Sequence, residues 1–427
     1  METKHKVRGG KGQEKAYRAF KALPESLDEC TVLGLLRFGG QTLLKSAIAA
    51  EITEHLHRGY YEHGSERSVT GERNGYRKTI LDTPVGQVSY DRPLVSHAPG
   101  FHSQYHVPYM RRPKEFAEAV CDMYVNGIAT GNVKRALKSV AGNRSRLSKA
   151  SVSRITKKLR RDFEEWKKRD LSQLKVVYLF LDAIRVKMRF DSSGKQSVMI
   201  SYAVLEDGTF ETLSISVRAS ESNLGWDSTV LDLKERGMRD PLLTISDGND
   251  GVIHSIDTRL PTSLRQRCVK HKIENILECV PKENHEEVKK SLHRIFIGAT
   301  SLEQAKMAIL DFRHRYRNRY PSAIECLDRD LAQCLTYFVF PVSHWKLIRT
   351  SNRLERMNGE IKRRLKAIGH HPHETGCMAL ILKVCMKYTD NRKRRIAVTE
   401  LVKALWTKLR ERQSEVMIQL ELDLKAA

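Results

Sequence analysis

The chain has 427 residues, which at roughly 100–200 residues per domain suggests two to four domains. Its formal net charge of +24 makes a polyanion the natural partner, and the phosphate backbone of nucleic acid is the commonest polyanion. The alternative to a nucleic-acid partner is a protein that is merely basic. Eight cysteines without paired spacing argue against a disulfide scaffold. With no signal sequence and no run of about 18 apolar residues, we expect a cytoplasmic protein without a membrane segment.

The first part of the chain is predicted to be mainly helical. Residues 1–12 are rich in lysine and glycine and are expected to be disordered. Apolar residues recur at helical spacing over residues 33–57. Residues 79–92 have the alternation of a short hairpin with its turn at residues 84–86. Four prolines then predict an extended connector over residues 93–113.

A broken helical stretch follows over residues 116–168. Gly127 and Gly142 interrupt it, and the last helix begins near Ser148 or Ser151, both plausible N-caps. The segment from Gly127 onward resembles a helix-turn-helix, whose second helix could lie in the major groove of DNA. The residues predicted to contact DNA from this helix are Arg154, Lys157, Lys158 and Arg161. A solvated charged helix is the alternative, because charge alone is weak evidence.

From residue 176 onward, strands and helices are mixed. Apolar runs predict strands at residues 176–181, 186–190, 198–205, 212–217 and 242–245, with a helix at 226–236 between the last two. This order indicates an α/β layer. No convincing strand occurs in residues 284–340, which read as helices. Helices are also predicted at residues 352–366 and 378–388, on either side of a loop that contains His370, His371 and His373, and the tail is amphipathic.

Two aspartates directly follow apolar strands in this layer. Asp182 comes after residues 176–181 and Asp247 after residues 242–245. A carboxylate at the carboxyl end of a buried strand lies where α/β ligand sites commonly form. Two adjacent carboxylates repel each other unless a cation such as Mg²⁺ intervenes. For either aspartate alone, a turn or cap role is the simpler interpretation.

Glu355 is the third candidate carboxylate. It neighbours an apolar helical stripe, with Asn358 and Lys362 on its own side at i+3 and i+7. It can therefore lean toward a packed sheet edge. A capping pair of Asn352 with Glu355 at the helix start explains it equally well.

Together the three carboxylates have the composition that phosphodiester chemistry requires. Metal ions held by carboxylates can activate a hydroxyl nucleophile on one side and stabilise the leaving oxygen on the other. The chain contains no GxxxxGK[ST] loop, so we expect no nucleotide cofactor.

Cys268 and His271 form a CxxH element. As a zinc site it supplies two ligands where a structural zinc usually takes four. The downstream group of His370, His371, His373 and Cys377 could supply more, but a buried cysteine near a DNA-facing histidine is the favoured interpretation.

At these residues the chain resembles the Mutator-type transposases of bacterial insertion sequences, which are DDE transposases. The matching blocks are residues 179–183, 245–248 and 349–364, with residues 266–273 as the CxxH block and residues 73–77 upstream. Each block alone is unspecific, but their combination and order are specific. The similarity covers about residues 35 to 395.

The resemblance implies an RNase H-like catalytic domain with an all-helical insertion and a mainly helical N-terminal DNA-binding region. It implies Asp182, Asp247 and Glu355 as catalytic metal ligands for Mg²⁺ or Mn²⁺, with Cys268 and His271 as accessory residues. The expected partners are the terminal inverted repeats and target DNA, bound by a homodimer associated with the bacterial nucleoid. The basic residues Lys362, Arg363 and Arg364 are expected to contact phosphates.

The predicted domain organisation has five parts. They are an N-terminal DNA-binding region (1–110), a helix-turn-helix-like segment (111–170), a catalytic domain (171–283 and 341–395), a helical insertion (284–340) and a helical tail (396–427). Two alternatives to a transposase stay open. One is a non-catalytic DNA-binding regulator built on a transposase scaffold, and the other is a nuclease without joining activity.

Overall fold

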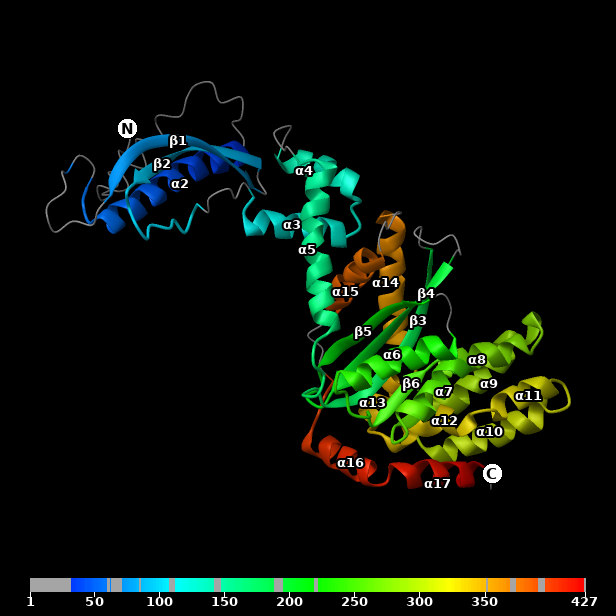
Figure 1. Ribbon diagram of the computed structural model, residues 1–427. Coiled ribbons are helices and arrows are strands. Elements are labelled where there is room, and N and C mark those ends of the chain that lie inside the picture. Colours follow the sequence, from blue (N-terminus) through cyan, green and yellow to red (C-terminus); the bar gives the residue numbers. More distant parts are fainter. Residues whose placement is uncertain are drawn as a thin grey trace, which may run out of the picture. The chain divides into compact units, whose positions relative to one another are not determined.

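The computed structural model describes most of the chain from residue 32 to residue 425, in two compact units (Figure 1). The first unit contains residues 1–124 and 130–155, and the second contains residues 125–129 and 156–427. The predicted tail at residues 1–12 and the three histidines of the loop after residue 368 lie outside the described residues. The described ranges are 32–59, 62, 71–83, 86–106, 112–141, 147–187, 195–218, 222–350, 352–368, 374–390 and 396–425.

In the first unit a helix packs on a two-stranded hairpin. Helix α2 (Val32–Leu56) lies against β1 (Glu72–Thr83) and β2 (Gly86–Ser96), with Ile52 and Tyr90 in their shared core. Both strands of the hairpin extend further from the turn than predicted, since their pairing reaches Glu72 opposite Ser96. The extra part of β1 is mostly exposed and polar, so it lacks the alternation that reveals a half-buried strand.

The predicted helical stretch after the hairpin is confirmed. It forms α3 (Lys114–Val125), α4 (Thr130–Ala141) and α5 (Lys149–Lys167). Ser148 caps α5, because its Oγ accepts a hydrogen bond from the backbone N–H of Ser151 at 3.1 Å.

The second unit is built on a five-stranded mixed sheet with the order β5-β4-β3-β6-β7. Strands β3, β4 and β5 are antiparallel neighbours, and β6 and β7 are parallel to β3. The strands are β3 (Val176–Lys187), β4 (Lys195–Leu205), β5 (Phe210–Arg218), β6 (Leu243–Ser246) and β7 (Leu264–Arg267).

Two details of this sheet correct the sequence prediction. Strand β3 continues through Asp182 to Lys187, so Val186 belongs to the same strand and does not begin a new one. The ladder with β4 pairs Asp182 with Ile200 and holds this extension in place. Strand β7 was not predicted at all, since its sequence is short and polar.

Helices cover both faces of the sheet (Figure 1). On one face, α6 (Asn223–Glu235) and α7 (Asp250–Arg259) close a core that includes Leu179, Leu181 and Trp226. On the other face lie α14 (Asn352–Ile368), which contacts β3, and α15 (Glu374–Asp390), which contacts β5.

The stretch predicted to lack strands, residues 284–340, is helical. With the preceding α8 (Val269–Glu278) and η2 (Lys282–Asn284), it comprises α9 (His285–His293), the π-helical turn η3 (Arg294–Gly298), α10 (Leu302–Tyr316), α11 (Pro321–Asp328), α12 (Leu331–Leu335) and η4 (Thr336–Val339). Its last two elements cover β7, where buried Gln266 donates to the carbonyl of Cys334 and accepts from the N–H of Tyr337. These helices thereby protect the edge of the sheet.

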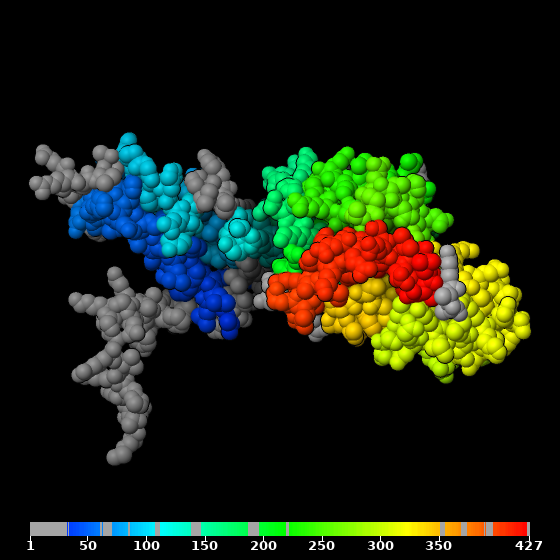
Figure 2. All heavy atoms as spheres, turned by 90° about the horizontal axis from the view of Figure 1, so that it is seen from below, coloured from blue at the N-terminus to red at the C-terminus, as the bar shows by residue number. Residues whose placement is uncertain are grey.

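The C-terminal segments close the second unit. Helix α13 (Val342–Ile348) and helix α16 (Glu400–Glu411) meet at the hydroxyl of Tyr178 on β3, which bonds to His344 Nδ1 at 2.8 Å and accepts from Trp406 Nε1 at 3.0 Å. Helix α17 (Gln413–Lys425) then contacts α12 and β7, and it is drawn at the red end of the colour range in Figure 2. Across the described residues, no helix is long and apolar enough to cross a membrane.

Candidate active site

Asp182 lies on the face of β3 that α14 covers. Side chains alternate along a strand, and Leu179 and Leu181 already point into the core with α6 and α7. Tyr178, which contacts α13 and α16, has the same parity as Asp182 and faces the other way. The alternation therefore directs the carboxylate of Asp182 toward α14.

The register of the sheet brings Asp247 alongside Asp182. Strands β3 and β6 are parallel, and the last paired residues are Phe180 and Ile245. Asp182 and Asp247 each lie two residues beyond this pair, so they are level with each other along the two strands. Strand β6 ends at Ser246, which leaves Asp247 in the turn before α7. Its Oδ1 accepts the N–H of Asn249 at 3.0 Å, so the turn fixes this carboxylate.

Asn358 on α14 connects the helix directly to Asp182. Its Nδ2 donates to Asp182 Oδ2 at 2.8 Å, while Asp182 Oδ1 accepts the N–H of Ala183 at 2.8 Å. Asn358 is only 6% exposed, and its own Oδ1 has no hydrogen-bond partner among the described residues. A buried amide oxygen without a partner is unusual and is a further oxygen that a cation could use. The sequence offered one signal for this role, the i+3 spacing from Glu355.

The carboxylates interact electrostatically. Burial, followed by the negative charge of Asp247, raises the pKa of Asp182 to about 7. Glu355 contributes in the same direction, and His271 opposes it. Asp247 and Glu355 are therefore both close enough to Asp182 to affect its charge. Such a cluster favours a proton or a cation, and its oxygen-rich donor set fits Mg²⁺ or Mn²⁺.

Glu355 belongs to a group that includes the start of α8. Its Oε2 accepts a hydrogen bond from Lys270 Nζ, and its Oε1 lies 4.0 Å from His271 Nε2. A contact with Cys268, followed by the charges of Asp247 and Asp182, raises the pKa of His271 to about 9. Lys270 was not among the predicted site residues. The capping alternative for Glu355 involves the side chain of Asn352, which lies outside the described residues.

Two backbone hydrogen bonds fix the β7–α8 junction beside the site. The N–H of Cys268 donates to Ser246 at 2.8 Å, and the N–H of Val269 donates to Arg349 at 2.9 Å. The chain thus ties Cys268 to the residue that precedes Asp247. This explains how the CxxH element comes to lie near the carboxylates.

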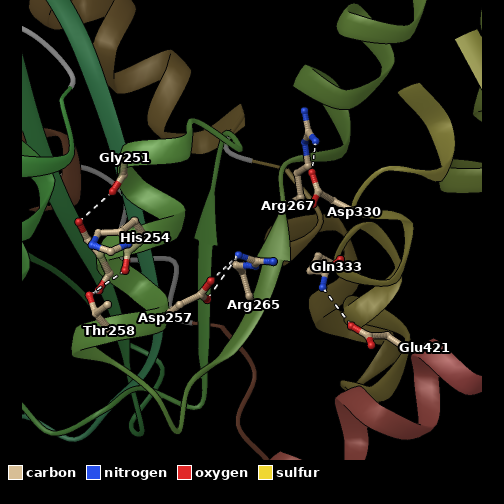
Figure 3. A network of polar contacts seen from close by, with 10 residues as sticks. Gly251, His254, Asp257, Thr258, Arg265, Arg267, Asp330, Gln333 and Glu421 are labelled. Atoms are coloured by element: carbon tan, nitrogen blue, oxygen red, sulfur yellow. Dashed lines mark hydrogen bonds and ion pairs between the residues drawn. The ribbon is translucent and has the colours of Figure 1, made fainter. Parts of the chain in front are cut away.

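Arg267 supports the turn that carries Asp247. Gly248 has a φ of +89°, and a Cβ there would lie 2.6 Å from Arg267 Nε. The guanidinium is in turn held by Asp330 at 2.5 Å, at the start of α12 (Figure 3). Figure 3 also shows Arg265 paired with Asp257 of α7 at 3.1 Å. Arg267, which was not predicted as a site residue, links the Asp247 turn to the start of α12.

The basic residues predicted to contact DNA fall into two sets. Arg154, Lys157, Lys158 and Arg161 are all exposed, and their spacing places them on one side of α5. On α14, Lys362 is exposed, whereas Arg363 and Arg364 both bond to Glu360. The ion pairs with Glu360 therefore reduce the positive charge that Arg363 and Arg364 can offer a phosphate.

Comparison with known proteins identifies the family of this chain. Residues 15–395 match the family described as "Transposase, Mutator family". The chain belongs to the Mutator family of transposases. Among its relatives in this family is the transposase for insertion sequence element ISRM5 of Rhizobium meliloti, 27% identical over 82% of this chain and 87% of the relative. Another is the transposase for IS256 in transposon Tn4001 of Staphylococcus aureus, 29% identical over 82% and 88%. The IS1081 transposase of Mycobacterium tuberculosis is 28% identical over 83% and 85%.

Proposed function

We propose that the protein is an insertion-sequence transposase whose catalytic residues are Asp182, Asp247 and Glu355. It cleaves DNA at the ends of its element and joins the released 3′-hydroxyl to target DNA. The observation that carries this proposal is the register of β3 with β6, which aligns the two aspartates on a face covered by the helix of Glu355. Membership of the Mutator family supports it.

The domain organisation is part of the proposal. Residues 171–283 and 341–395 form an RNase H-like catalytic domain, interrupted by the helical insertion at 284–340 and followed by a helical tail at 396–427. The mixed sheet with helices on both faces supports this assignment. Residues 1–110 and the helix-turn-helix-like segment 111–170 bind the terminal inverted repeats. Simultaneous binding of two element ends makes a homodimer the expected assembly.

Asp182, Asp247 and Glu355 would hold Mg²⁺ or Mn²⁺, which when bound activates the attacking hydroxyl and stabilises the leaving oxygen. Asn358 orients the carboxylate of Asp182 through the hydrogen bond to its Oδ2. Lys270 orients Glu355 in the same way. Exposed lysine and arginine side chains on α5 and α14 neutralise backbone phosphates.

The test is incubation of the full chain with duplex DNA carrying the terminal repeats and Mg²⁺, followed by separation of cleaved and joined products. We expect cleavage and strand transfer from the unchanged protein. Asp182→Asn, Asp247→Asn and Glu355→Gln should each lower both by at least about a hundredfold while the protein still binds DNA. Glu303→Gln, an exposed carboxylate on α10, is the control and should not change the rate.

Each alternative function has its own outcome in this assay. DNA binding without cleavage by the unchanged protein would identify a regulator built on a transposase scaffold. Cleavage that depends on the three carboxylates but yields no joined product would identify a nuclease.

A further inference from the structure

We propose that Cys268, His271 and Glu355 form a second metal site, specific for Zn²⁺ or a similar transition metal, and that Zn²⁺ bound there inhibits the transposase. The inhibition rests on the proposed function, because Glu355 is shared with the carboxylate cluster. The binding itself does not depend on catalysis.

The three side chains converge from two elements. Cys268 follows β7 as the N-cap residue of α8, and His271 comes one turn later, so the CxxH spacing brings thiol and imidazole together at the start of the helix. Helix α14 supplies Glu355. One ligand atom from each side chain lies within 4.8 Å of the other two. A short adjustment of side-chain rotamers would bring them to the distances of a zinc site.

The site is held in place without a metal. Cys268 is fully buried, and its backbone is fixed by the hydrogen bond to Ser246. His271 faces the carboxylate with Nε2, which lies 4.0 Å from Glu355 Oε1. A neutral imidazole can coordinate a metal through this nitrogen.

Glu355 can take part without losing its contact with Lys270. Its two carboxylate oxygens have different neighbours, since Oε2 accepts a hydrogen bond from Lys270 and Oε1 is the atom near His271. A metal bound through Oε1 leaves the contact at Oε2 intact. One thiolate and one carboxylate would balance the charge of a divalent ion, and the protons of the thiol and of the imidazolium would pass to solvent on binding.

The donor set determines which ion fits. A thiolate and an imidazole favour Zn²⁺ or Co²⁺, whereas Mg²⁺ prefers oxygen ligands alone. Three protein ligands leave a fourth position of the tetrahedron for water. The CxxH spacing alone indicates only two ligands for such a site, because Glu355 lies more than eighty residues further along the chain.

Inhibition follows from the sharing of Glu355. A carboxylate turned toward Cys268 and His271 is withdrawn from Asp182 and Asp247. Zn²⁺ should therefore slow cleavage in the presence of Mg²⁺ at least about tenfold once the site is occupied, since even loss of a group that only orients a metal ligand commonly costs that much activity.

The experiment uses Co²⁺ as a spectroscopic probe of the full chain, without DNA or Mg²⁺. We expect one equivalent of Co²⁺ to give the charge-transfer absorption of a cobalt–thiolate bond, and one equivalent of Zn²⁺ to remove it. Cys268→Ser should abolish the band. His271→Asn should weaken Co²⁺ binding at least about tenfold. Cys279→Ser changes an exposed thiol at the other end of α8 and should leave the band unchanged.

Absence of the band in the unchanged protein, or its persistence in Cys268→Ser, would overturn the metal site. If Cys268→Ser does not fold by circular dichroism, His271→Asn decides in its place, and unchanged Co²⁺ affinity would count against the proposal. A normal cobalt band in a protein that does not cleave DNA would contradict the proposed function and leave the metal site standing. Cleavage unaffected by saturating Zn²⁺ would contradict the inhibition.

Discussion

At the scale of single residues, the site depends on how the chain holds Asp182. Asn358, which is only 6% exposed, donates a hydrogen bond to Oδ2 of Asp182. Asn358→Ala removes this donor and lets the carboxylate rotate. We expect the Mg²⁺ concentration for half-maximal cleavage to rise about tenfold, since residues that orient metal ligands commonly contribute this much.

The measurement for Asn358 is the cleavage rate as a function of Mg²⁺ concentration. Gln419→Ala changes an exposed amide on α17 that donates to Asp423 at 2.7 Å, and it serves as the control. A loss of rate that is the same at every Mg²⁺ concentration would show that Asn358 has a merely structural role.

The pKa of Asp182 makes a prediction about stability. Its folded-state pKa of about 7 lies above the ordinary 3.8, so the folded protein binds this proton more tightly than the unfolded chain does. The stabilisation of the folded protein by this bound proton is complete below about pH 4 and is lost as the pH rises through 7. Without divalent metal, Asp182→Asn should therefore be more stable than the unchanged protein at pH 8, by a few kcal/mol at most.

Thermal unfolding in EDTA at pH 5 and pH 8 measures this effect. The unfolding temperature of Asp182→Asn should clearly exceed that of the unchanged protein at pH 8, and the difference should be much smaller at pH 5. An equal gain at both pH values would mean that the charge of Asp182 is not its source.

At the scale of elements, the turn after β6 is predicted to tolerate no side chain at Gly248. Its φ of +89° disfavours other residues, and a Cβ would meet the buried guanidinium of Arg267, which Asp330 holds in place. Gly248→Ala should lower the free energy of unfolding by about 1–3 kcal/mol. Gly359→Ala on α14, where a Cβ meets nothing within 4 Å, should instead raise it by about 0.5–1 kcal/mol. Equal effects in denaturant unfolding would contradict this account.

The sheet shows which elements a sequence can reveal. Strands β4, β5 and β6 carry continuous or alternating apolar residues, and they were predicted. Strand β7 has the sequence Leu-Arg-Gln-Arg. It pairs with β6, and its buried Gln266 side chain bonds to α12 and η4, about seventy residues later. No local pattern contains that information, because long-range hydrogen bonds decide that this polar segment is a buried strand.

The candidate site also contains some residues that the sequence reveals and others that it does not. Asp182 and Asp247 could be selected because apolar strands precede them, and the register of β3 with β6 then aligns them. Asn358 and Lys270 could not be assigned roles, since their significance depends on contacts with Asp182 and Glu355 across large sequence separations. The predicted extent of β3 was wrong because Asp182 looks like a strand terminus when only local polarity is considered.

At the scale of the whole molecule, the charge of +24 should appear in the salt dependence of DNA binding. Each phosphate contact contributes about −0.9 to the slope of log K against log salt concentration. Replacing Arg154, Lys157, Lys158 and Arg161 together by alanine should reduce the magnitude of that slope by about 2–4. Replacing Lys403 and Lys408 of α16 is the control. An unchanged slope in the fourfold variant would exclude this face of α5 from the DNA interface.

In the proposed mechanism Asp247 binds the metal that cleavage requires, together with Asp182 and Glu355. The most direct test replaces Asp247 by cysteine and compares cleavage of terminal-repeat DNA in Mg²⁺ and in Mn²⁺. A thiolate is a poor ligand for Mg²⁺ and a better one for Mn²⁺. We predict no cleavage in Mg²⁺ and partial recovery in Mn²⁺, with no recovery for Asp247→Asn. Cleavage by Asp247→Cys at the unchanged rate in Mg²⁺, or the same loss in both metals, would contradict the account.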